Sequence, residues 1–146
     1  MSRIIYVGDV YSIALDEERD AITPKNGRDN RRKYCVVIGT PDYGYYVAYL
    51  IVNHEINMNF NTTREAIDGF FPITHADYPE FILPKYDPSW VDTNRVREMS
   101  AERMLNEGTF VCRLTDKDLS LILQTLANST VLTPKEKRRY GVLPPK

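Results

Sequence analysis

The sequence predicts a mainly β, α+β fold: a small antiparallel β-barrel of roughly five to seven strands, with a C-terminal helix packed across it and a short terminal helix. Two observations carry this prediction. Short apolar runs alternate with turn residues through most of the chain, a pattern typical of antiparallel strands. Near the C-terminus, one segment instead repeats its apolar residues at helical spacing. The 146 residues contain no internal repeat and no long linker, so residues 1–146 are expected to form a single domain.

The first predicted strand is Ile4–Leu15, in which two short apolar runs flank a bend at Gly8. The polar segment Asp16–Arg32 follows, with Asn26-Gly27 as a turn signal, and we expect it to form a long exposed loop. Its Asp16–Asn30 part holds too little apolar surface to offset the entropy lost on ordering. That part is therefore expected to be mobile until a partner binds.

A hairpin is predicted next. Tyr34–Gly39 and Tyr45–Val52 are strongly apolar runs, and the turn residues of Pro41–Gly44 join them. Thr62 is a candidate N-cap for a short helix. The proline-rich segment Gly69–Pro88 predicts irregular structure and short edge strands.

Three short elements are expected before the main helix. Trp90–Met99 alternates weakly between apolar and polar residues and is expected to form one strand. Ala101–Leu105 predicts a single helical turn closed by Gly108. Thr109–Leu114 predicts a further strand.

The best-marked element is the helix Asp116–Ala127, for which Thr115 is the expected N-cap. A second, short helix is expected between the N-cap Thr133 and Gly141, with a proline at its first position. The longer helix is expected to pack on the barrel through one apolar face. This face consists of Leu119, Ile122, Leu123 and Leu126.

Composition and charge exclude several classes of protein. A net charge of −1 argues against a chain that coats nucleic acid. Lysine and arginine residues nevertheless form short clusters, which suit either an anion site or a solvated face. The apolar runs are too short to span a bilayer, and Met1–Val10 lacks the features of a signal peptide, so a cytoplasmic location is expected. Cys35 and Cys112 lie in apolar strands and are expected to be buried thiols, with a disulfide or metal pair as the alternative.

The candidate chemistry is cationic. Arg31, Arg32 and Lys33 form a basic cluster at the start of a strand. Arg95 and Arg97 alternate on a later strand, which would place them on one face about 7 Å apart. Guanidinium groups bind phosphate with two parallel hydrogen bonds and stay charged, so we expect one anion-binding surface that suits single-stranded RNA.

The signals for catalysis are weaker. None of the common catalytic motifs with glycine-rich, cysteine-pair or histidine-pair spacing occurs in the chain. His54 and His75 are the two histidines, and each suits a structural role or acid–base chemistry. A metal site would need more ligands at closer spacing, so neither a metal nor another cofactor is expected.

The motifs Gly8-Asp9-Val10 and Asn94–Arg103, together with the apolar strand and hairpin between them, resemble the PemK/MazF toxin family. The resemblance covers most of the chain but skips Asn57–Pro88. It implies an SH3-like barrel and a homodimeric endoribonuclease that cleaves single-stranded RNA without a metal. It also implies a small antitoxin protein as partner. The alternative is a non-catalytic SH3-like module that binds a protein or nucleic acid.

At the family's functional positions this chain has its own residues. Lys33-Tyr34, with Arg32 before it, stands where the family has its catalytic arginine and proline, and Asn53 stands at the threonine or serine position. Asn94-Arg95 stands at the family's Asp-Gln pair. If Arg32, Asn53 and Arg95 converge in one groove, the nuclease is favoured. The candidate catalytic residues are Arg32, Lys33, Asn53 and His54, and the candidate RNA-binding residues are Arg31, Asn94, Arg95 and Arg97.

Overall fold

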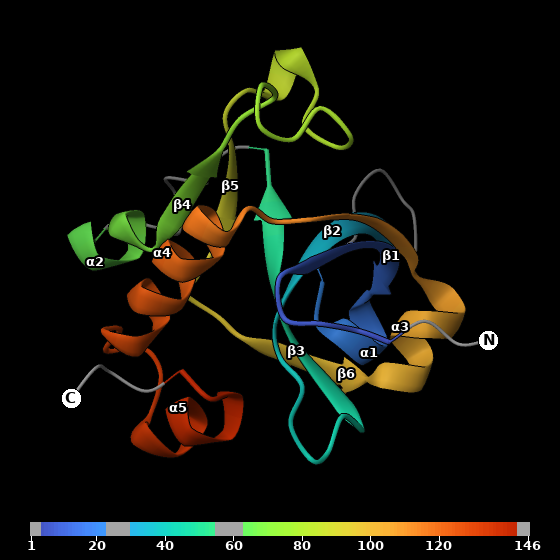
Figure 1. Ribbon diagram of the computed structural model, residues 1–146, viewed down its shortest axis with the longest axis vertical. Helices are drawn as coiled ribbons and strands as arrows, with labels where there is room; N and C mark the ends of the chain where they lie inside the picture. Colours follow the sequence, from blue (N-terminus) through green and yellow to red (C-terminus); the bar gives the residue numbers. More distant parts are fainter. Residues whose placement is uncertain (1–3, 23–29, 55–62, 143–146) are drawn as a thin grey trace.

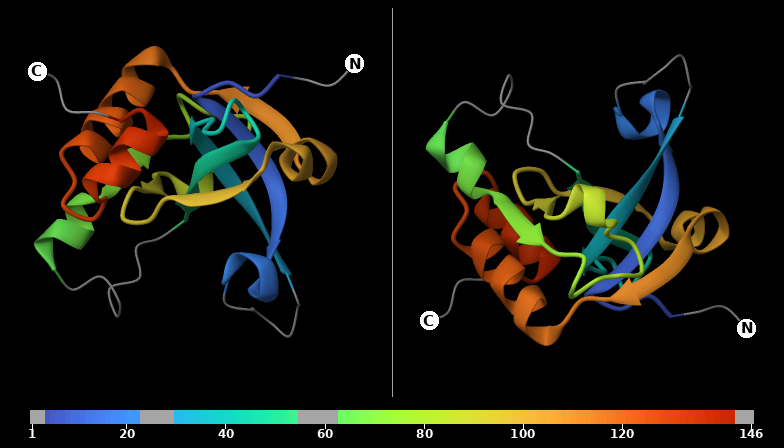
Figure 2. Two further views of the ribbon diagram at one scale, coloured as in Figure 1. Left: turned by 90° about the horizontal axis from the view of Figure 1, so that it is seen from below. Right: turned by 90° about the horizontal axis from the view of Figure 1, so that it is seen from above.

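One curled antiparallel sheet forms the body of the protein. The computed structural model describes residues 4–22, 30–54 and 63–142, apart from the side chains of residues 30, 31, 65 and 66. Within these ranges the strands run in the order β4-β5-β3-β2-β1-β7, and β6 pairs with the first half of β3. The sheet curls into a half-barrel (Figures 1 and 2). The strands are β1 (Asp9–Asp16), β2 (Asn30–Gly39), β3 (Tyr46–Asn53), β4 (Phe70–Ile73), β5 (Ser89–Asp92), β6 (Arg97–Ser100) and β7 (Thr109–Arg113).

The helices lie in two groups, with α4 and α5 on one side of the sheet and α1 and α3 on the other (Figure 1). No helix in the described parts of the chain combines the length and apolar character that crossing a membrane requires. The predicted α+β fold with an antiparallel sheet and C-terminal helices is confirmed. The helical elements are α1 (Glu17–Asp20), α2 (Arg64–Asp68), η1 (Pro84–Tyr86, a 3-10 turn), α3 (Ala101–Glu107), α4 (Asp116–Ala127) and α5 (Pro134–Tyr140).

Alternation along β2 divides the core between the two faces of the sheet. Val36 and Ile38 belong to an apolar cluster that includes Ile122 and Leu126 of α4 and Tyr140 of α5. Cys35 and Val37 belong to a second cluster, which α3 covers with Met104. A strand with both faces buried reads as a continuous apolar run. Neighbouring residues of β2 therefore serve opposite faces, and the same alternation decides which polar side chains can meet.

Helix α4 has the bounds that its sequence predicts. The side-chain oxygen of Thr115 accepts a hydrogen bond from the Asp118 backbone N–H, and Asn128 follows the last helical residue. Ile122 and Leu126 are fully buried. Leu119 and Leu123 are partly buried against the same cluster, so the predicted apolar face does pack on the sheet.

The segment after β1 differs from the expected long loop. β1 continues to Asp16, whose side chain caps α1 by accepting a hydrogen bond from the Arg19 backbone N–H. The short helix ends in a left-handed residue, Ala21, and Asp20 is buried. Asp16 through residue 22 is therefore ordered structure, because an aspartate N-cap and ion pairs replace the missing apolar surface. The predicted mobility of the rest falls on residues 23–29, which lie outside the described residues, as does Thr62.

The predicted single strand Trp90–Met99 is two strands, β5 and β6. A turn separates them, in which the Asn94 backbone N–H donates to the Asp92 carboxylate at 2.9 Å. The N–H and hydroxyl of Thr93 both donate to the Gly69 carbonyl, at 2.8 and 2.6 Å. Side-chain and turn hydrogen bonds of this kind compete with strand pairing. The consequence for function is that Arg95 lies in the turn and Arg97 opens β6.

Candidate functional site

A polar pocket opens beside the turn between β5 and β6. Its volume is about 180 Å³, and it collects side chains from segments that are far apart in the sequence. We call it the cationic pocket, because three of the described side chains that line it carry positive charge and one carries negative charge. The described lining residues are Ala21, Ile22, Lys33, Ile51, Asn53, Asp92, Arg95 and Arg97.

The pairing of β2 with β3 places two of these residues together. The register sets Tyr34 opposite Val52, so Lys33 and Asn53 lie side by side on the α3 side of the sheet. The Lys33 ammonium donates to the side-chain oxygen of Asn53 at 3.2 Å. Since β5 pairs with the end of β3, its last residue, Asp92, reaches the same pocket.

The two arginines enter the pocket differently. Arg95 is exposed in the turn, whereas Arg97 is partly buried at the start of β6, where it pairs with Tyr49. The Arg97 guanidinium donates to the backbone carbonyl of Asp20. Burial, followed by the charge of Arg95, lowers the pKa of Arg97, but a guanidinium stays protonated at any relevant pH. The pocket thus holds neighbouring cations whose repulsion an anion would relieve.

Asp92 is the site residue that the sequence analysis missed. Burial raises the pKa of Asp92 above its ordinary value, against the hydrogen bonds from Asn94 and the neighbouring arginine charges, which lower it. A carboxylate with a raised pKa beside cations is a candidate acid–base group. The signal available in the sequence was the Asp92-Thr93-Asn94 run, which is typical of a side-chain-stabilised turn.

The other predicted site residues lie elsewhere. Arg32 is on the opposite face of β2 from Lys33, and its guanidinium donates to the Ser12 carbonyl at 3.4 Å. The ring of His54 stacks on Tyr86 with centroids 4.0 Å apart. Arg32 and His54 do not line the cationic pocket. Asn94 lines a neighbouring hollow on the other side of the turn, and the side chain of Arg31 is outside the described residues.

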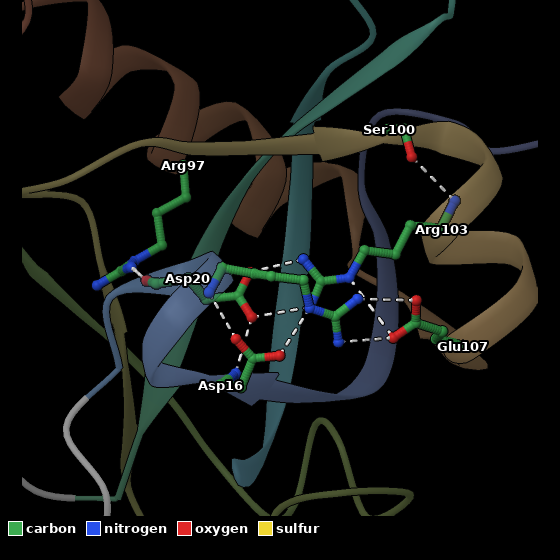
Figure 3. A network of polar contacts seen from close by, with 7 residues as sticks. Asp16, Asp20, Arg97, Ser100, Arg103 and Glu107 are labelled. Carbon is green, nitrogen blue, oxygen red and sulfur yellow. Dashed lines mark hydrogen bonds and ion pairs between the residues drawn. The ribbon is translucent and has the colours of Figure 1, made fainter. Parts of the chain in front are cut away.

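An ion cluster lies at the end of α1, next to the pocket, and Figure 3 shows its contacts. Its members are Asp16, Arg19, Asp20, Arg103 and Glu107. Arg103 of α3 donates to both carboxylate oxygens of Asp20, at 2.7 and 2.8 Å. The Asp20 side chain is 2% exposed and that of Arg103 is 13% exposed. Burial opposes ionisation of Asp20, but the hydrogen bonds from Arg103 and from the Asp16 N–H outweigh it and hold the pKa of Asp20 below its ordinary value. The cluster therefore fixes the end of α1, whose next two residues line the pocket.

Both cysteines are free. Burial raises the pKa of Cys35 to about 12 and that of Cys112 to about 11, so neither is a thiolate at neutral pH. In the part of the chain that the structure describes, no group of three acidic, histidine or cysteine residues could hold a metal ion. The chemistry available near the pocket is that of ammonium, guanidinium, carboxylate and amide groups.

Comparison with known proteins leaves the family open. No protein-family model matches the chain, and no match was found among the curated proteins. The resemblance to PemK/MazF toxins therefore stays a prediction, and the cationic pocket is the feature whose chemistry bears on function.

Proposed function

We propose that this protein is a toxin-like endoribonuclease that cleaves single-stranded RNA without a metal, with the cationic pocket as its phosphate site. One observation supports the proposal above the others. Lys33, Asn53, Arg95 and Arg97 come from segments separated by up to about 60 positions, yet all four line one pocket with Asp92. The cations suit the binding of a phosphodiester. The partly buried carboxylate between them suits the removal of a proton from the neighbouring 2′-hydroxyl.

The pocket supplies the groups that this cleavage needs. Ionised Asp92 accepts the proton of the ribose 2′-hydroxyl, whose oxygen attacks the adjacent phosphorus. The bond between phosphorus and the 5′-oxygen breaks, and the Lys33 ammonium gives its proton to the departing oxygen. Arg95 and Arg97 stabilise the negative charge that develops on the phosphoryl oxygens. The products are a 2′,3′-cyclic phosphate and a 5′-hydroxyl, with no change of oxidation state, and proton exchange with water restores Asp92 and Lys33.

Replacing Asp92 by asparagine is expected to slow cleavage by about 100-fold or more, since a positioned base contributes at least that factor. RNA affinity should be retained, because the cations remain. In the wild type the rate should fall as the pH drops through the raised pKa of Asp92, since the base is then protonated, and the variant should lack this fall. The measurement is cleavage of labelled single-stranded RNA in the presence of a chelator, with a 2′-deoxy substrate as the control. Equal rates for D92N and the wild type would rule out the assigned base.

Removing two pocket cations should weaken RNA binding far more than removing two surface cations. The variant pair is K33Q/R95Q and K135Q/K137Q, which lose the same charge; Lys135 is exposed and Lys137 partly exposed on α5. Each lost phosphate contact makes the slope of log affinity against log salt shallower by about 0.7 for single strands. The slope of K33Q/R95Q should therefore be shallower than that of the wild type by about 1.4. Equal losses in both double variants, or a wild type that binds no RNA at low salt, would contradict the phosphate site.

A non-catalytic RNA- or protein-binding module is the second candidate. It is favoured by the positions of Arg32 and His54, which lie away from the pocket and so leave cleavage to Asp92 and Lys33. Specific RNA binding without any cyclic-phosphate product would select this alternative. The toxin proposal also includes that the protein forms a homodimer and binds an antitoxin protein. It predicts growth arrest when the chain is expressed in bacteria without that antitoxin.

A further inference from the structure

A second hollow lies across the turn between β5 and β6 from the cationic pocket. It has a volume of about 520 Å³, within the range of small-molecule sites. The start of β4, the turn itself and the C-terminal end of α4 each supply part of its lining. We call it the amide hollow, because Asn94, Gln124 and Asn128 are among its lining residues.

The two sites share one wall. Asp92 and Arg95 line the cationic pocket, whereas Thr93 and Asn94, between them in the chain, line the amide hollow. Consecutive Cα atoms are about 3.8 Å apart, so Asp92 and Asn94 are within about 7.6 Å of each other. The two sites are therefore separated by one short turn, and a single RNA strand that crosses this turn reaches both.

The hollow is built to hold its shape. Thr93 donates two hydrogen bonds to the Gly69 carbonyl. The side chain of Asn94 lies so close over Gly69 that a Cβ on this glycine would come within 2.4 Å of the Asn94 amide oxygen. The Asn94 backbone N–H also bonds to Asp92 at 2.9 Å, which ties the wall of one site to the carboxylate of the other.

The chemistry of the hollow suits a nucleobase and not a phosphate. Among the described residues that line the hollow there is no cation, and the one charged residue, Asp68, is an acid paired with Arg64 at 3.1 Å. The C-terminal end of α4 also faces the hollow, and a helix C-terminus carries partial negative charge. Phe71 and Leu121 add apolar surface beside the amides. Proteins hold unstacked RNA bases with this combination of apolar contact and amide hydrogen bonds.

We infer that the amide hollow binds one base of the RNA whose phosphate lies in the cationic pocket, and that it prefers a base with an exocyclic amino group. The inference rests on the proposed function and adds a specificity site to it. An exocyclic amino group donates hydrogen bonds to the Asp68 carboxylate and to the side-chain amide oxygens of the lining, and uracil has no such amino group. Asn94, which the sequence suggests as an RNA-binding residue, is then assigned a contact to the base.

Oligo(C) and oligo(U) of equal length test this preference, because cytosine carries an amino group where uracil carries a carbonyl oxygen. At fixed ionic strength the wild type should bind oligo(C) about 5- to 10-fold more tightly, the worth of one hydrogen bond. N94A, in the turn, and N128A, at the end of α4, should each reduce this ratio and keep the salt slope of the wild type. K33Q/R95Q should keep the ratio of the oligo(C) and oligo(U) affinities and reduce the salt slope. Equal wild-type affinities, or a ratio that survives both asparagine substitutions, would overturn the inference.

Free nucleosides separate failure of this site from failure of the proposed function. Cytidine, titrated into ¹⁵N-labelled protein, should shift the side-chain amide signals of Asn94 and Asn128 more than uridine does. A protein that binds cytidine in this way but binds no RNA would overturn the phosphate site and keep the base site. A protein that binds RNA while cytidine leaves both amide signals unchanged would overturn the base site alone.

Discussion

Replacing Arg103 by methionine is expected to lower the free energy of unfolding by about 3–5 kcal/mol, the usual cost of leaving one partner of a buried ion pair uncompensated. Asp20 is 2% exposed and receives two hydrogen bonds from Arg103 within 2.8 Å. In the variant the carboxylate keeps its burial and loses the guanidinium. Urea unfolding followed by circular dichroism measures the loss.

Acid should reduce the difference in free energy of unfolding between the wild type and R103M. In the wild type the pKa of Asp20 is below its ordinary value, so its contribution to stability is present above the unfolded-state pKa and is lost as the pH falls through the folded-state pKa. In R103M the hydrogen bonds from Arg103 are lost, and burial is opposed mainly by the hydrogen bond from the Asp16 N–H. The pKa of Asp20 should therefore rise relative to the wild type, and the variant gains relative stability once the carboxyl is protonated. The two stability curves should therefore approach each other in mild acid.

The exposed end of the same cluster provides a matched control. Arg19 pairs with Asp16 at 2.7 Å and with Glu107 at 3.2 Å, but its side chain is 50% exposed. Water screens such pairs, so R19M should cost much less than R103M. Equal losses in the two variants would mean that burial of the Asp20 pair does not matter. Because Arg97 bonds to the Asp20 carbonyl, R103M should also weaken RNA binding.

The predictable parts of the fold are those with local signals. The bounds of α4 and the capping box of α5 follow from residues within one helical turn, and the structure has both. The Asp20–Arg103 pair joins residues 83 positions apart, so no local pattern reveals it. The same is true of Lys33 and Asn53, which meet only because of the register between β2 and β3.

The candidate site was harder to predict than the fold, for two physical reasons. Arg32 and Lys33 are adjacent in the sequence, but the alternation of a strand sends them to opposite faces, and the cluster alone does not show which one faces the pocket. Asp92 was missed because one continuous strand was expected from Trp90 to Met99. The structure has a turn in the middle of this segment, and the Asp92 side chain stabilises that turn. The charged pocket residues that the sequence predicted, Lys33, Arg95 and Arg97, are all cations, and the one that was missed is an acid.

The remaining large effect is expected in the core, where replacing Ile122 by alanine should cost about 2–5 kcal/mol. Ile122 is fully buried between α4 and the sheet, so the substitution removes apolar contacts and leaves a cavity. L121A is the matched control, since the neighbouring leucine is 39% exposed on the same helix and alanine preserves the helix equally well at both positions. Urea unfolding of both variants and the wild type measures the effect. A loss under about 1 kcal/mol for I122A would be too small for a buried isoleucine and would mean that α4 is not docked on the sheet.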